Sequence, residues 1–329
     1  MNTRELFDAA PRRLGDAPAG KKIVLYYAGI LTALSGLGML MNFLLNLQIS
    51  KTGGLGSMGV RSVLEALQSM VPMVQSALLM CVAVGYQAAM LRIARGQYAS
   101  PQTLRLGFGR FWVLLRSGIA QGLIYLAIGM ASMYLASLIF TMTPWANALM
   151  EIVAPMIAGL DSTLTTPALD PDTVARLIPV MRPMIWIFLG LFVLFALPVS
   201  LRLRMVNYVI IDKPGTGALA ALGESRKMMR YHVLDLLRLD LRLWWWYAAL
   251  AFATVLCYAD TLLPALGVQL PLSPTAAYYV FYVLYLAVQF ALYYCLGNRV
   301  EVTYALAYEE VRPHEEPSNG AVLGNIFQM

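Results

Sequence analysis

Few polar side chains in this chain lie where they could do chemistry, because most of the sequence is apolar. Four of them fall in or beside long apolar segments, where a polar group is costly unless it is paired or hydrated. They are Arg116, Gln121, Asp240 and Gln289. If they converged within a bundle of helices, they would line a polar cavity for a small solute or a lipid.

Each of the four side chains also has a simpler interpretation. A long side chain such as that of Arg116 can reach the lipid headgroups from the end of a span, and glutamines commonly bridge neighbouring membrane helices through hydrogen bonds. Asp240 falls on the apolar side of a polar stripe, so it needs either a water-filled space or a cationic partner. Arg202 and Arg204 are the candidate partners.

The residue types that carry hydrolysis or metal binding form no recognisable pattern. The two histidines, His232 and His314, lack metal-ligand spacing to another histidine, cysteine or acid. The three cysteines fall inside apolar segments without a CxxC spacing. No serine-nucleophile, zinc-protease or phosphate-loop motif occurs in a fitting context. We therefore expect no catalytic residue, no cofactor and no metal ligand, and we do not expect an enzyme.

Six apolar segments of membrane-spanning length must position these side chains. A helix rises about 1.5 Å per residue, so about 20 apolar residues cross a hydrocarbon core of about 30 Å. The composition, 59% hydrophobic and 13% charged, is typical of such a protein. The predicted fold is all-α, a polytopic transmembrane bundle of six spans. They are expected at about 23–47, 71–91, 112–140, 183–201, 243–266 and 276–296.

The distribution of basic residues predicts the orientation of the spans. Of the 24 Lys and Arg residues, all but Lys51, Arg61, Arg176 and Arg182 lie in one set of alternating loops and in the two tails. The positive-inside rule then places both termini in the cytoplasm, with tails at 1–22 and 312–329 and a membrane domain at 23–311. The net charge of +6 is explained by loops that face anionic inner-leaflet lipids, and nucleic acid is not an expected partner.

One segment between spans four and five stands out as structured outside the membrane. From Thr216 to Arg242, polar residues recur at steps of three and four residues, which predicts an amphipathic helix on the inner leaflet. Its basic side chains, Lys227, Arg238 and Arg242, are candidate contacts for lipid headgroups or for a protein partner. On the other side, an acid before a proline at Asp170-Pro171 predicts that the helix of span four begins outside the bilayer.

Several short segments, in order and spacing, are similar to a known family. They are Thr3–Leu6, Gly85-Tyr86, Leu91–Gly96, Gly107–Phe111, Ala220–Asp240 and Tyr304–Glu309. From the N-terminus to about Val311 the chain thereby resembles the bacterial integral membrane protein family catalogued as domain of unknown function 975. The resemblance implies a multi-pass protein of the bacterial plasma (inner) membrane, and it implies no activity or catalytic residue.

Two functions are compatible with these patterns. The first is a non-enzymatic accessory or scaffold protein of the envelope, which contacts a membrane-protein partner or a second copy of itself through the basic cytoplasmic helix. The alternative is a transporter of a small solute or lipid, with Arg116, Gln121, Asp240 and Gln289 in a polar cavity within the bundle.

Overall fold

The structure, a computed structural model, describes residues 3–17, 19–51, 58–159, 171–265 and 273–312, together with 268 and 271. Every regular element among these residues is a helix. A chain in lipid must satisfy its backbone hydrogen bonds internally, and a helix does so within a single segment. Five of the helices in the described part are long and apolar enough to cross a membrane. The all-α fold is thus confirmed.

The chain divides into two compact units. One comprises Met1–Arg116 and Arg204–Met329, and the other comprises Ser117–Leu203. The second, smaller unit contains most of α5 (Phe111–Thr141), α6 (Pro144–Gly159) and α7 (Pro171–Leu203), of which α6 packs on α7. Helix α7 begins at Pro171, as the sequence predicts.

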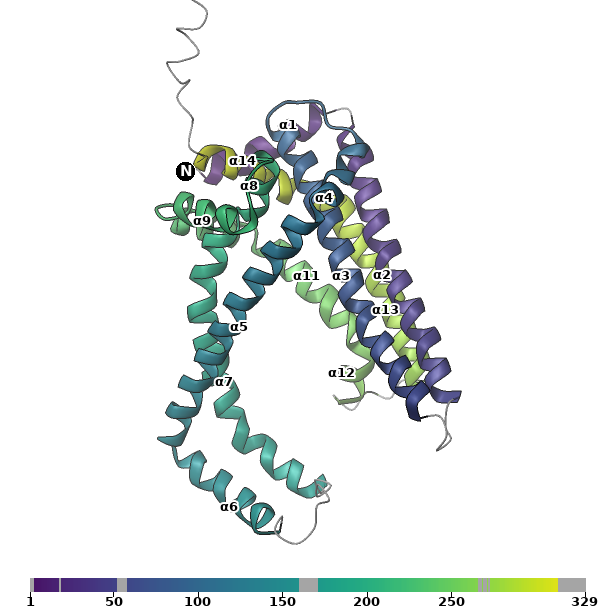
Figure 1. Ribbon diagram of the computed structural model, residues 1–329, viewed down its shortest axis with the longest axis vertical. Helices are drawn as coiled ribbons and strands as arrows, with labels where there is room; N and C mark the ends of the chain where they lie inside the picture. The colour runs from purple at the N-terminus through teal and green to yellow at the C-terminus, as the bar shows by residue number, and fades with distance from the viewer. Residues whose placement is uncertain are drawn as a thin grey trace, which may run out of the picture. The chain divides into compact units, whose positions relative to one another are not determined.

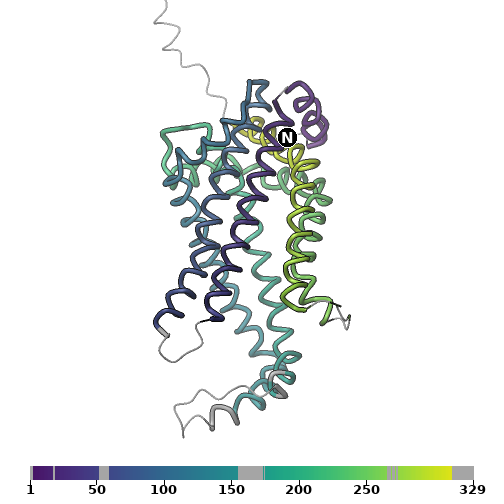
Figure 2. Tube along the Cα trace, turned by 90° about the vertical axis from the view of Figure 1, so that its right-hand side faces the viewer, coloured from purple at the N-terminus to yellow at the C-terminus, as the bar shows by residue number. Residues whose placement is uncertain are grey.

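Four helices form the long part of the larger unit (Figures 1 and 2). Helix α2 (Gly20–Lys51) pairs with α3 (Met58–Ala94), α13 (Pro274–Leu292) packs on α2, and α11 (Trp244–Cys257) packs on α13. The rings of Tyr27 and Tyr86 stack at 3.9 Å between α2 and α3.

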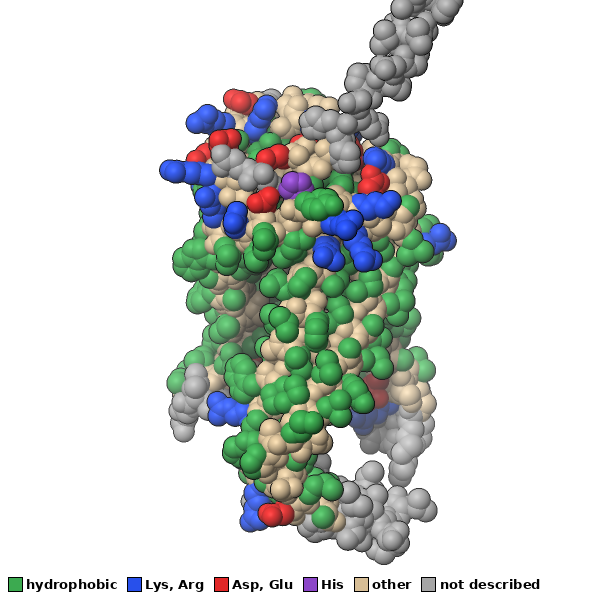
Figure 3. Space-filling view, turned by 90° about the vertical axis from the view of Figure 1, so that its left-hand side faces the viewer, with side chains coloured by type: hydrophobic (Ala, Val, Ile, Leu, Met, Phe, Trp, Pro, Cys, Tyr) green, Lys and Arg blue, Asp and Glu red, His purple; other side chains and the backbone are tan. Residues whose placement is uncertain are grey.

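Shorter helices gather at one end of this unit. They are α1 (Thr3–Gly15), η2 (Pro101–Arg105), α4 (Leu106–Gly109), α8 (Val206–Asp212), α9 (Ala218–Met228), α10 (Val233–Arg242) and α14 (Asn298–Val311). Helix α1 packs on α14, and η2 and α4 pack on α3. We call this the basic end. Figure 3 shows many Lys and Arg side chains gathered at this end.

Two glycines allow η2 and α4 to pack closely on α3. A Cβ atom at Gly85 would overlap the backbone carbonyl of Leu104, and one at Gly107 would overlap the backbone carbonyl of Cys81. Only glycine lets two backbones approach this closely. The loop after α3 is therefore fixed against the helix rather than merely tethered to it.

The predicted amphipathic helix over Thr216–Arg242 is wrong in one respect, because the structure divides it into α9 and α10. Between them, Arg230 and His232 donate backbone hydrogen bonds three residues back, to Lys227 and Met229, which makes turns instead of α-helix. An unbroken helix of this length would extend about 40 Å. The break keeps both halves on the bundle, with Leu222 and Leu236 buried.

The predicted segment 243–266 forms two helices instead of one. They are α11 and α12 (Ala259–Ala265), which meet at Tyr258. Helix α11 is apolar but shorter than the five long helices. At the other end of the chain, α13 runs through a π-helical turn at Tyr293–Gly297 into α14. The tail predicted at 312–329 lies outside the described residues except for Arg312.

Candidate functional site at the basic end

Asp240 lies on the buried side of α10 and has a cationic partner. Arg204 Nη2 lies 3.8 Å from Asp240 Oδ1, and only 18% of the Asp240 side chain is exposed. The hydroxyl of Tyr304, on α14, donates a hydrogen bond to the same carboxylate oxygen. Tyr247, in the first turn of α11, donates a second one at 3.2 Å. Of the two candidate arginines, Arg204 is therefore the one that pairs with Asp240.

Arg204 stands at the centre of this cluster. Its Nη2 donates to the hydroxyl oxygens of Tyr247 at 2.6 Å and of Tyr304 at 2.9 Å, and its guanidinium lies 4.7 Å from the centre of the Tyr304 ring. The two tyrosine hydroxyls are 2.7 Å apart. Hydrogen bonds to charged groups are stronger than neutral ones, so the cluster neutralises the Asp240 charge inside the protein.

A second cluster of charged side chains joins α3, α8 and α14. Arg95, just after α3, lies 2.7 Å from Asp212 and 2.6 Å from Glu309. Arg312 adds a contact of 3.2 Å to Asp212, whose side chain is only 9% exposed. The hydroxyl of Tyr308 donates to Asp212 Oδ2, the oxygen that Arg312 contacts, at 3.1 Å, whereas Arg95 contacts Oδ1. Three segments distant in sequence are thus held by one set of ion pairs.

The charge of Arg95 is stabilised within this second cluster. Burial lowers the pKa of its guanidinium, but the hydrogen bonds to Glu309 and Asp212 raise it further than burial lowers it. The charged form of Arg95 is consequently favoured in the folded protein. The two clusters have no arrangement of nucleophile and base, and their geometry suits holding helices together.

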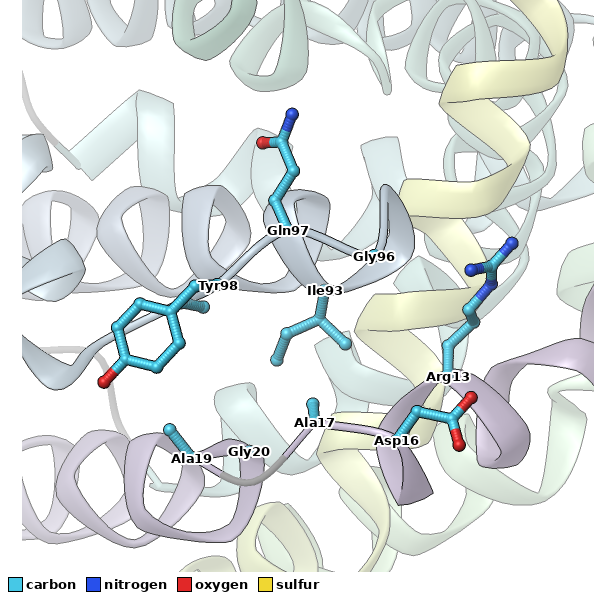
Figure 4. A pocket seen from close by; sticks show the side chains of 10 residues that line it. Arg13, Asp16, Ala17, Ala19, Gly20, Ile93, Gly96, Gln97 and Tyr98 are labelled. Atoms are coloured by element: carbon cyan, nitrogen blue, oxygen red, sulfur yellow. The ribbon is translucent and has the colours of Figure 1, made fainter.

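A small cavity of about 260 Å³ lies beside these clusters (Figure 4). It is bounded by the end of α1 and the start of α2 on one side, and by the turn after α3 on the other. Gly96 in that turn has φ +69°, a conformation that favours glycine. Arg13, Asp16 and Tyr98 line the cavity, so its wall carries charges of both signs.

The outer surface of α9 and α10 combines basic and apolar side chains. Lys227, Arg238 and Arg242, the predicted contact residues, are all exposed, as is Arg230. Beside them are exposed apolar and aromatic side chains, Leu219, Tyr231, Leu234 and Leu241. Tyr231 is 80% exposed and Leu234 is 67% exposed. We call these eight residues the α9–α10 surface.

The other predicted cavity residues have different surroundings. Arg116 is exposed on α5. Gln121 donates a hydrogen bond of 3.2 Å to Ser117, one turn earlier in the same helix. Gln289 is partly buried on α13, and its Oε1 has no hydrogen-bond partner among the described residues. Among the described residues of the larger unit, no hydrogen bond or ion pair joins Arg116, Asp240 and Gln289 to one another.

The tyrosines and the Arg95 cluster were missed by sequence reasoning. Tyr247 lies in a run of aromatic residues that is typical of an anchor at the membrane interface, and nothing in its local sequence indicates a contact with Asp240. Arg95, Tyr304 and Glu309 fall in segments that carry the family resemblance, and this was the only sequence signal for them. Among the described residues, no group of three or more His, Cys, Asp or Glu side chains is placed to hold a metal ion.

Comparison of the chain with protein-family models, with curated proteins and with solved structures finds no match.

Proposed function

We propose that this chain is a multi-pass protein of the bacterial plasma membrane that acts without catalysis, as an accessory or scaffold protein for other membrane proteins. This proposal rests on the α9–α10 surface. Its side chains are exposed, although α9 and α10 are held firmly on the bundle. Membership of the family catalogued as domain of unknown function 975, six spans and cytoplasmic termini are parts of the same proposal.

The two polar clusters supply the rigidity that a docking surface needs. Asp240 on the inner side of α10 is fixed by Arg204 and Tyr304, so the outer side of the helix is presented in one orientation. A binding surface that is ordered beforehand loses less entropy when a partner docks. The Arg238 guanidinium lies 3.8 Å from Asp235 on the same helix, and its side chain is 72% exposed, so a partner's acidic group can also reach it.

The composition of the surface favours a protein partner at the membrane. Arginine and tyrosine are enriched in protein interfaces, and exposed leucines provide apolar area that water does not favour. The basic side chains also attract anionic headgroups of the inner leaflet, which would keep the surface near the bilayer. The proposed partner is therefore a membrane protein with an acidic cytoplasmic segment, or a second copy of this chain.

The transporter alternative receives less support from the structure. It needs the four polar side chains to converge with free polar groups, whereas Asp240 is paired with Arg204 and Gln121 is bonded to Ser117. Of these four residues, only Gln289 is among the described residues that have a buried polar atom without a hydrogen-bond partner.

Co-purification from native membranes tests the proposal. The variant K227E/R238E/R242E reverses the surface charge, and K21E/K22E/R105E reverses three exposed charges at the same end that lie on α2 and η2. We expect a stoichiometric partner, or a self-associated form, to be retained by the wild type and by the second variant and lost from the first. Equal retention by all three proteins would refute the role of this surface.

A further inference from the structure

The end of the larger unit remote from the basic end contains a cavity of about 710 Å³. It lies between α2, α3, α12 and α13, and all the residues that line it belong to this one unit. Pockets of about 300–1,000 Å³ are typical of sites for small organic molecules. The volume is therefore suited to a ligand larger than a bare ion.

The wall of this cavity is acidic. Glu65 on α3 and Asp260 on α12 line it, and no Lys, Arg or His is among the described lining residues. Glu65 pairs with Arg61 at 2.9 Å, but both side chains are more than half exposed, so this pair is weak. Asp260 is partly buried and makes no ion pair within the described part of the chain. A cation is the charge that this wall favours.

Hydrogen-bond acceptors surround the two acids. Asn46 Oδ1 accepts a hydrogen bond from Gln68 Nε2 at 3.1 Å, which joins α2 to α3 across the wall. Pro72 lies one turn after Gln68 and has no backbone N–H, so the carbonyl of Gln68 lacks its helical partner. Both residues line the cavity.

Aromatic rings complete the wall on the α13 side. The rings of Tyr278 and Tyr279 lie 5.2 Å apart, and Tyr279 packs edge-on against Phe43 at 5.1 Å. Tyr278 is 40% exposed, and it lines the cavity together with Tyr279. An aromatic face attracts an ammonium group, with the largest effect where the cation is desolvated.

We propose that this cavity binds a small organic ammonium ion, with Asp260 as its counter-ion, Glu65 as a second acid and Tyr278 as an aromatic wall. The absence of basic side chains among the described lining residues disfavours phosphate and carboxylate ligands. A divalent metal ion is disfavoured because the described acids form no group of three. The site is independent of the proposed scaffold function, since it shares no residue with the α9–α10 surface.

Titration calorimetry on the full-length protein in lipid nanodiscs tests this site. The probes are choline and putrescine, and 3,3-dimethylbutan-1-ol is the neutral counterpart of choline. We expect saturable binding of at least one ammonium probe and none of the neutral alcohol. D260N should weaken that binding by at least about tenfold, because a charged partner is lost. E151Q, which removes an exposed acid on α6, should leave it unchanged.

A tyrosine pair keeps the test decisive if D260N is poorly folded. Y278F retains the aromatic face and Y278L removes it, so we expect binding to survive in the first variant and to weaken in the second. Equal binding of choline and its neutral counterpart, no saturable binding of either ammonium probe, or equal affinities in D260N and E151Q would overturn the assignment.

Discussion

The guanidinium of Arg95 lies 2.6 Å from the carboxylate of Glu309, although 214 residues separate them in the chain. This contact joins the end of α3 to the helix that follows α13. Asp212 binds the same guanidinium from α8 at 2.7 Å. The basic end therefore depends on charged side chains from three distant segments.

The Arg95 cluster gives a prediction about stability. D212N leaves Arg95 and Arg312 without one of their carboxylate partners in a poorly hydrated place, so we expect a loss of about 2–4 kcal/mol. Thermal unfolding in detergent should show a midpoint at least about 5 °C lower. E65Q, which breaks only the exposed Arg61–Glu65 pair, is the control and should shift the midpoint very little. Equal shifts would contradict the role of Asp212.

The Asp240 cluster predicts a non-additive double mutant. D240N leaves the Arg204 charge without its carboxylate, and R204M leaves the Asp240 charge without its cation, so each should be destabilised by about 2–4 kcal/mol. The double variant D240N/R204M removes both charges and should be less destabilised than the sum of the two. Unfolding midpoints of the four proteins measure this coupling. Strict additivity would show that the two charges do not interact.

Close backbone packing gives a third prediction. G85A and G107A each place a Cβ atom against a backbone carbonyl, which cannot move aside as a side chain can. We expect each to be destabilised by about 1–3 kcal/mol or to fail to accumulate in membranes. Gly109, in the same short helix as Gly107, has open space at its Cβ position, so G109A is the matched control. Normal stability of G85A and G107A would contradict the packing.

The sequence predicted the long helices well because each carries its own signal. Apolar residues in runs of membrane-spanning length indicate α2, α3, α5, α7 and α13 without knowledge of any partner. The proline at position 171 likewise marked the start of α7. In contrast, the division between α9 and α10 was not predicted. The polar stripe continues across it, and the burial of Leu222 and Leu236 on either side of the turn depends on the tertiary structure.

The candidate site was predicted only in part, for a similar reason. Asp240 was predicted to need a partner because it lies on the apolar side of a helix that has a polar stripe. Arg204 was one of the two arginines expected as its cationic partner. Tyr247 and Tyr304 are 57 residues apart, and only the fold brings their hydroxyls within 2.7 Å. The exposure of Lys227, Arg238 and Arg242 follows from the stripe itself, whereas the apolar residues around them depend on the tertiary structure.

The number of spans has a direct consequence for the two termini. With six spans, including 243–266, both termini lie on the cytoplasmic side, whereas five spans would place them on opposite sides. We expect a fluorescent protein fused after Met329 to fluoresce, because it folds in the cytoplasm. We expect alkaline phosphatase fused after Pro271 to be active, because that position lies outside. An inactive phosphatase fusion together with a dark C-terminal fusion would show that the segment 243–266 does not span the membrane.

The most direct test of the scaffold proposal is photo-crosslinking in living cells from position 231, where the native tyrosine is 80% exposed on the α9–α10 surface. A photoreactive amino acid at position 134, exposed on α5, is the control. We predict a discrete protein adduct from position 231 that is absent from position 134 and is lost when Lys227, Arg238 and Arg242 are changed to Glu. Lipid adducts alone at position 231, or the same protein adducts from both positions, would contradict the proposed function.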